Sequence, residues 1–228
     1  MPGSRSYRYA TLICSLPSHG SLSEIRQTPL SRIRLWQRLK NMLDLEDYRC
    51  LVRAVDLLEW HHHPMEESDF DFLERIHREI DHLHHPFLRD LATWRLELRS
   101  LVAALRHRNA GLTTPPQVPW GYGRWLPAIR RNWNQEFFGL EKAHPWLKEG
   151  HRLLREENAH DFEKLLLKVV WDHLDRLSID HVFDFEAVTI YVQRWDLIDR
   201  WIRYRPAQAL DRFDSLVQAG LAPVSQGI

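Results

Sequence analysis

Apolar residues recur at helical spacing along most of the chain, and this pattern constrains the fold more than any other feature of the sequence. Residues 161–177 are apolar around most of a helical wheel, which predicts a helix buried on several sides. Residues 185–204 are apolar over about half of the wheel and follow Asp184, a good N-cap residue. Residues 86–109 confine their apolar side chains to a narrower arc, which predicts a surface helix with one buried stripe. The periodicity therefore predicts an all-α fold.

The residue composition supports this fold class. Leucine occurs 34 times, valine and isoleucine together occur 22 times, and glycine occurs only nine times. A β-sandwich or a β-barrel needs more β-branched residues and more turns. One stretch, residues 7–16, is strand-like and ends at Pro17. We therefore expect eight or nine helices, the last over about 206–219, and one short N-terminal extended segment.

A change in composition divides the chain. Residues 112–127 contain four prolines and two glycines, too many for a regular element. This segment is predicted to be a linker between two helical lobes. The N-terminal lobe then covers residues 1–111 and the C-terminal lobe covers residues 128–228.

The charge balance and the lack of long apolar runs argue against several classes of protein. The chain has 31 basic and 31 acidic residues, and a net charge of zero argues against nucleic acid as the partner. No apolar run approaches the roughly 18 residues of a membrane span, and no signal peptide is recognisable. Two isolated cysteines, Cys14 and Cys50, cannot build a disulfide framework or a zinc knuckle. We expect a cytoplasmic protein without a transmembrane segment.

The sequence contains no recognisable catalytic motif. It lacks a Gly-x-Ser-x-Gly nucleophile elbow and a Gly-rich phosphate loop. The paired carboxylates at 66–67 and 156–157 lie near predicted helix ends, where solvated charge is the ordinary explanation. We therefore expect no catalytic residues and a protein that is not an enzyme.

Fourteen histidines raise the alternative of a helical metalloprotein. The spacing Glu-x-x-His, which helices of di-iron proteins use in pairs, occurs at Glu59/His62, Glu79/His82, Glu141/His144 and Glu157/His160. Histidines also cluster at 61–63 and at 82, 84 and 85. Only Glu79 and His82 lie inside a predicted helix, and one pair does not make a site. We expect no bound metal or cofactor, and a centre built on Glu79, His82 and neighbouring histidines is the alternative.

Aromatic residues in the predicted linker are candidates for contact with a partner. The chain has ten tryptophans, and 26 arginines against five lysines, and both Trp and Arg are favoured at protein interfaces. Trp120, Tyr122 and Trp125 alternate with glycines that leave them little local packing. They could instead tether the linker to the two lobes. A third alternative is that they stack on single-stranded nucleic acid beside Arg130 and Arg131.

Arg194 is a further candidate because it lies in the middle of the apolar half of the 185–204 helix. A buried charge without a partner is too costly to retain. Arg194 must therefore pair with a carboxylate in the core or contact a partner protein. In the first case, its replacement by alanine leaves a buried carboxylate and costs about 3–5 kcal/mol.

Two regions resemble an uncharacterised bacterial family that is encoded among the subunits of V/A-type ATPases. The segment Tyr9 to Pro17 resembles the start of that family. The stronger similarity covers about 160–205, at Glu163, Trp171, Leu174, Asp175, Leu177, Phe183, Glu186, Tyr191, Arg194, Arg200 and Trp201. Arg194 stands where the family usually has a lysine. Six of these residues are expected to be structural positions: Glu163, Trp171, Asp175, Tyr191, Arg200 and Trp201.

The resemblance implies a mechanical function. The family is thought to take the place of an all-helical, funnel-shaped subunit that lies on the membrane-bound proteolipid ring and is known as d in eukaryotes. The resemblance therefore implies a non-catalytic subunit that couples the central rotor stalk to the ring. Its partners are then the stalk subunits and the ring, and its location is the inner face of the membrane. A general protein or nucleic-acid interaction module is the remaining alternative.

Overall fold

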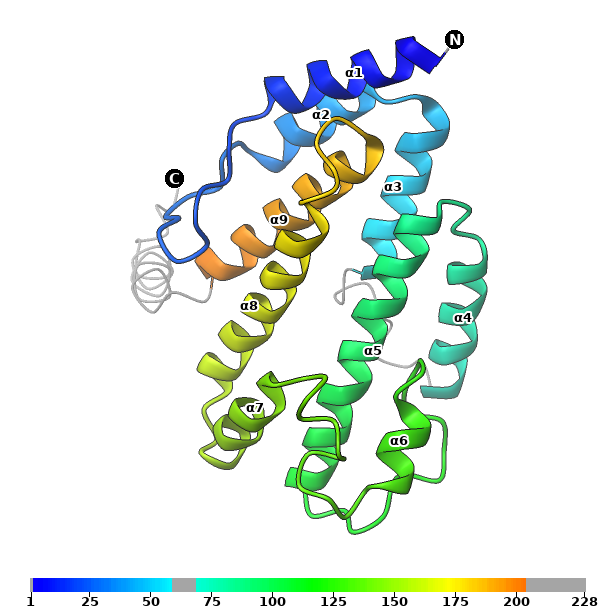
Figure 1. Ribbon diagram of the computed structural model, residues 1–228, viewed down its shortest axis with the longest axis vertical. Helices are drawn as coiled ribbons and strands as arrows, with labels where there is room; N and C mark the ends of the chain where they lie inside the picture. The colour runs from blue at the N-terminus through cyan, green and yellow to red at the C-terminus, as the bar shows by residue number, and fades with distance from the viewer. Residues whose placement is uncertain (1, 59–68, 204–228) are drawn as a thin grey trace, which may run out of the picture.

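The structure, a computed structural model, describes residues 2–58 and 69–203 (Figure 1). Within these ranges the chain is all-α, and no residue belongs to a strand. The helices are α1 (Pro2–Ser15), α2 (Arg32–Met42), α3 (Leu45–Leu58), α4 (Asp69–Asp81), α5 (Pro86–Asn109), α6 (Leu126–Arg131), α7 (Trp146–Arg155), α8 (Ala159–Leu177) and α9 (Phe185–Arg203). The all-α prediction is confirmed. The helix expected over 206–219 and the motif Glu59/His62 lie outside the described residues.

Helix α5 is the central element of the molecule. It begins at Pro86, whose ring suits the first turn of a helix, and it runs along much of the longest axis in Figure 1. Its apolar side chains contribute to each of the four hydrophobic clusters of the described chain. Its packing partners are α3, α4, α7 and α9. The prediction of a surface helix with one buried stripe is therefore wrong, because different turns of α5 are covered by different neighbours.

The expected N-terminal extended segment is also wrong. Residues 7–16 lie almost entirely within α1, which packs against α2 and α9. Leu12 and Leu16 are buried, and Tyr9 and Ile13 pack against the same cluster. The spacing of these four residues is that of one helical face. The described part of the chain offers no strand with which an extended segment could pair.

The second half of the chain forms two long helices, as predicted. Asn158 caps α8 by accepting the Asp161 N–H at 3.0 Å, and Asp184 caps α9 by accepting the Ala187 N–H at 2.8 Å. Helix α8 packs on α7 and α9, and α9 also packs on α1, α3 and α5. None of the described helices combines the length and the apolar character that a membrane span requires.

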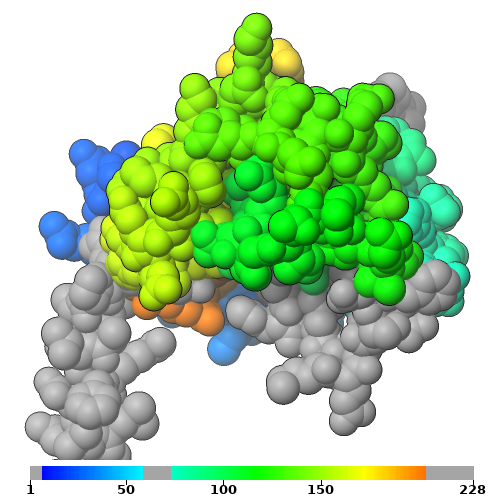
Figure 2. Space-filling view, turned by 90° about the horizontal axis from the view of Figure 1, so that it is seen from below, coloured from blue at the N-terminus to red at the C-terminus, as the bar shows by residue number. Residues whose placement is uncertain are grey.

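The lower end of the molecule is shown in Figure 2. There the end of α5 lies together with the segment that follows it, with α6 and α7, and with the start of α8. Helix α6 is short, and Ile129 is its buried residue. The division of the chain into two lobes at 112–127 stays a prediction.

Candidate functional site

The candidate site is a groove of about 590 Å³ between α5 and α8, called here the arginine groove. Its floor is apolar and includes residues such as Leu98, Val102, Leu167 and Val170. Trp120, Gly121 and Tyr122 border it from the segment after α5. Its charged lining consists of Arg95, Arg99, Arg106, Arg200 and Glu163.

Positive charge exceeds negative charge in this lining. Glu163 serves two guanidinium groups, with its Oε1 3.6 Å from Nη2 of Arg106 and its Oε2 3.5 Å from Nη2 of Arg200. Burial, together with the nearby charge of Arg200, lowers the pKa of Arg95 to about 10, against a smaller opposing effect of Asp196. Arg95 therefore remains charged at neutral pH. One carboxylate among four arginines leaves a surplus that suits an anionic group.

The sequence did not point to this groove, although one signal was present. Arg95, Arg99 and Arg106 are four and seven residues apart, so they lie along one face of α5. The fourth arginine, Arg200, comes from α9 and the single carboxylate from α8. No short-range pattern indicates that these three helices bring their charges together.

The segment predicted to be a loose linker is anchored firmly on α5 next to the groove. The Ser100 hydroxyl accepts the Tyr122 N–H at 2.6 Å, and the Arg124 N–H donates to Oε1 of the buried Glu97 at 2.9 Å. Gly123 has φ +96°, and a Cβ there would lie 2.3 Å from Cγ of Glu97. The expectation that glycines leave the aromatic residues little local packing is wrong. Glycine instead permits close contact between the segment and α5.

The three linker aromatics differ in their surroundings. Trp120 is 9% exposed and packs against Trp133, so much of its surface is already covered. Tyr122 is half-buried and its hydrogen-bonded backbone fixes it at the edge of the groove. Trp125 packs edge-on against His144 and does not line the groove. The arrangement leaves Tyr122 as the linker aromatic best placed to contact a ligand.

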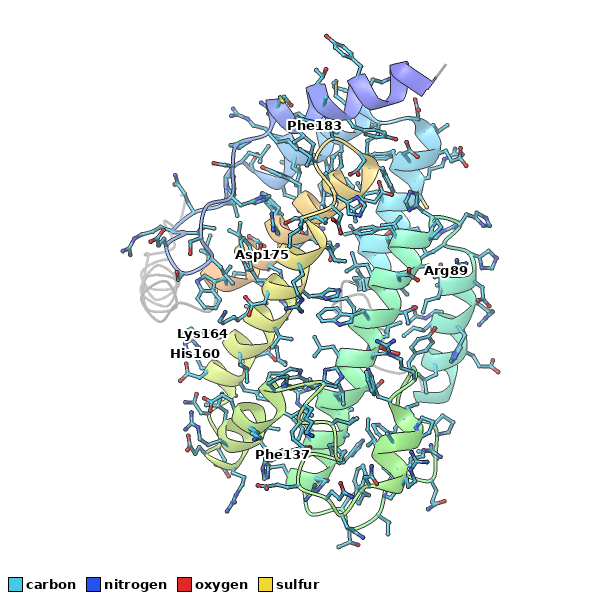
Figure 3. All side chains as sticks on the ribbon, viewed as in Figure 1. Arg89, Phe137, His160, Lys164, Asp175 and Phe183 are labelled. Atoms are coloured by element: carbon cyan, nitrogen blue, oxygen red, sulfur yellow. The ribbon has the colours of Figure 1, made fainter. Side chains whose placement is uncertain are left out.

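Arg194 has an ionic partner. Its guanidinium contacts the carboxylate of Asp175, donates to the Ser178 hydroxyl at 3.0 Å and lies 5.4 Å from the ring centre of Trp171. Asp175, labelled in Figure 3, lies towards the C-terminal end of α8. The Arg194 side chain is 20% exposed but that of Asp175 is 50% exposed. Arg194 thus pairs with a carboxylate, and its removal leaves no buried charge behind.

We expect Arg194→Ala to lower the free energy of unfolding by about 1–2 kcal/mol, because it removes an ion pair with an exposed partner and the contact with Trp171. Urea unfolding monitored by circular dichroism measures the change. Arg203→Ala is the matched control, since Arg203 pairs with Asp199 within α9 and is half exposed. Such a pair contributes about 0.3–0.5 kcal/mol. Equal losses in the two variants would show that Arg194 does not tie α8 to α9.

The structure brings most of the family-like positions into pairs. Glu163 pairs with Arg200, and Asp175 pairs with Arg194 above Trp171. The Tyr191 hydroxyl donates to the Pro17 carbonyl at 2.8 Å, which joins the two regions of the resemblance. Trp201 packs against the cluster formed by α5, α8 and α9. These residues form a framework that holds α8 and α9 in place and supplies two groups to the groove.

The metal centre considered at Glu79 and His82 finds no support in the described part of the chain. Neither residue belongs to a group of three or more potential ligands. The His82 ring accepts or donates at the Arg78 carbonyl, within its own helical turn. Glu79 borders a separate pocket between α3 and α4.

A family model described as "Protein of unknown function (DUF2764)" matches residues 59–219 of the chain. This range contains every residue that lines the arginine groove. No curated protein and no solved structure matches the chain.

Proposed function

We propose that this chain, which belongs to the DUF2764 family of proteins of unknown function, is a non-catalytic coupling subunit of a bacterial V/A-type ATPase. In this proposal it acts like the funnel-shaped subunit on the proteolipid ring and links the ring to the central rotor stalk. The partner segment docks in the arginine groove. The chain then works at the inner face of the membrane through the complex, as a peripheral subunit.

The observation that carries this proposal is the composition of the arginine groove. An apolar floor between α5 and α8 favours an apolar side-chain stripe, and the surplus of arginine favours carboxylates beside it. An acidic amphipathic helix offers both features. Arginine is also the cationic residue most suited to bidentate contact with carboxylates.

The rigidity of the surroundings supports a mechanical function. Three helices meet at Glu163, whose ion pairs reach α5 and α9. The bordering segment is fixed to α5 by the hydrogen bonds of Tyr122 and Arg124. A subunit that transmits torque needs such a pre-organised contact surface, because a mobile surface would absorb the motion.

We expect the full-length chain to bind purified rotor-stalk subunits or the proteolipid ring, and Arg99→Gln with Arg106→Gln to weaken that binding at least about tenfold. The double variant keeps side-chain length but removes two charges from the groove. Binding is measured by pull-down and biolayer interferometry at two salt concentrations. Affinity should fall as salt rises, because the groove charges are accessible to solvent.

Arg89→Gln is the matched control, because Arg89 is an exposed arginine of α5 that does not line the groove (Figure 3). It should bind like the original chain. Binding to neither stalk nor ring would refute the assignment to the ATPase. Full binding by the double variant would instead refute the groove as the docking site.

A further inference from the structure

A second cluster of polar side chains lies at the start of α9, outside the arginine groove. His181, Asp184 and Glu186 hold their ligand atoms within 4.8 Å of one another, and all three are partly buried. Nδ1 of His181 lies 2.7 Å from Oδ2 of Asp184. Phe183, labelled in Figure 3, marks the loop between α8 and α9 that carries the first two residues.

A fourth residue, His85, approaches this cluster from the residue before α5. Its Nε2 lies 3.8 Å from Oε1 of Glu186, and its ring packs against Phe185 with the ring centres 4.8 Å apart. A separation of 3.8 Å is too long for a hydrogen bond. Nδ1 of His85 is buried and lacks a hydrogen-bond partner among the described residues. The ring can therefore keep its proton on Nδ1 and direct the lone pair of Nε2 toward Glu186.

We propose that His85, His181, Asp184 and Glu186 form a binding site for Zn²⁺. Two imidazole nitrogens and two carboxylate oxygens are a ligand set that zinc accepts with tetrahedral geometry. Zinc ligands at about 2.0–2.2 Å from the metal lie roughly 3.3–3.6 Å from one another. The separations in the cluster lie close to this range, so small side-chain rotations suffice.

The position of the cluster also fits a cation. Oδ1 of Asp184 caps α9 through the Ala187 N–H, which leaves Oδ2 for a metal. The two carboxylates carry a charge of −2, which a divalent ion neutralises. Bound zinc would tie the loop before α9 to the start of α5, two segments that are about 100 residues apart in the sequence. The site is thus structural and independent of the groove.

The test uses the untagged full-length chain and Zn²⁺ alone. We expect isothermal titration calorimetry to give one tight site per chain and thermal unfolding to shift upward with Zn²⁺. Asp184→Asn keeps an N-cap of equal quality but removes the carboxylate charge. Glu186→Gln keeps the shape of its side chain. Both variants, and His181→Ala, should bind Zn²⁺ at least about tenfold more weakly while the first two remain folded.

Two controls address the other histidines. His82→Ala removes an exposed histidine of the turn after α4, and a variant with alanine at His61, His62 and His63 removes a cluster outside the described residues. Both should retain the tight site. Absence of tight Zn²⁺ binding by the original chain would overturn the proposal. Tight binding that Asp184→Asn and Glu186→Gln leave unchanged would overturn it equally.

Discussion

Gly123→Ala is expected to lower the free energy of unfolding by about 3 kcal/mol. The backbone at Gly123 has φ +96°, a conformation that side chains disfavour, and the new Cβ would lie 2.3 Å from Cγ of Glu97. Glu97 is 5% exposed and accepts the Arg124 N–H, so it cannot move without losing that bond. Urea unfolding of the variant measures the loss.

Gly111→Ala separates the two causes of this effect. Gly111 has a similar φ of +89°, but a Cβ there would meet nothing within 4 Å. Its replacement therefore carries the backbone strain alone, about 1 kcal/mol. The difference between the variants measures how tightly the segment packs on α5. Losses of equal size would contradict the close contact between Gly123 and Glu97.

The sequence was sufficient to predict the helices whose signals are local. Helix α9 follows from its apolar periodicity and from Asp184, and the structure confirms both the helix and its cap. Helix α5 was predicted at its observed position, with Pro86 at its first turn and Gly111 just past its end. Caps and periodicity depend on residues a few positions apart, so a single sequence contains them.

Burial and partnership were harder to predict because they depend on tertiary contacts. The apolar arc of α5 indicated one buried face, but neighbours from both halves of the chain cover its other sides. Residues 7–16 combine β-branched and aromatic residues with a spacing that also fits a helix. The packing of Leu12 and Leu16 against α2 and α9 decides between the two.

The candidate site could be predicted only in part for the same reason. Arg194 required a carboxylate on energetic grounds, but its identity as Asp175 depends on how α8 and α9 pack. The arginines of α5 share a face in the sequence, whereas the contribution of Arg200 depends on three-dimensional position. The zinc site joins His85 to residues about 100 positions later, and no spacing rule reaches that far.

Lowering the pH from 8 to 5 is expected to reduce the free energy of unfolding by about 3 kcal/mol through two partly buried histidines. Burial, followed by the charge of Arg194, lowers the pKa of His19 from 6.5 to about 4. Burial, followed by the charges of Arg176 and Arg95, lowers the pKa of His173 to about 4. The rings pack on aromatic neighbours, with the His173 ring stacked on Trp94 at 3.6 Å between centres.

The sign of the effect follows from proton linkage. Between pH 6.5 and pH 4 the unfolded chain binds a proton at each histidine while the folded chain does not. Protonation therefore favours the unfolded state, and stability is lost as the pH falls through this window. The lowered pKa of His19 is worth about 2 kcal/mol at pH 5 relative to pH 8. That of His173 is worth about 1 kcal/mol, because solvent partly screens its less deeply buried ring.

Histidine-to-glutamine variants isolate these contributions from the carboxylates that titrate over the same range. The loss of stability between pH 8 and pH 5 should shrink by about 2 kcal/mol in His19→Gln and by about 1 kcal/mol in His173→Gln, as measured by urea unfolding at each pH. His84→Gln is the control, because His84 is exposed and its removal should leave the pH dependence unchanged. Since Arg194 contributes to the lowered pKa of His19, Arg194→Ala should also reduce the pH dependence while leaving the contribution of His173 intact. A pH profile that is the same in the original chain and in both buried-histidine variants would show that neither ring is held in its neutral form by the fold.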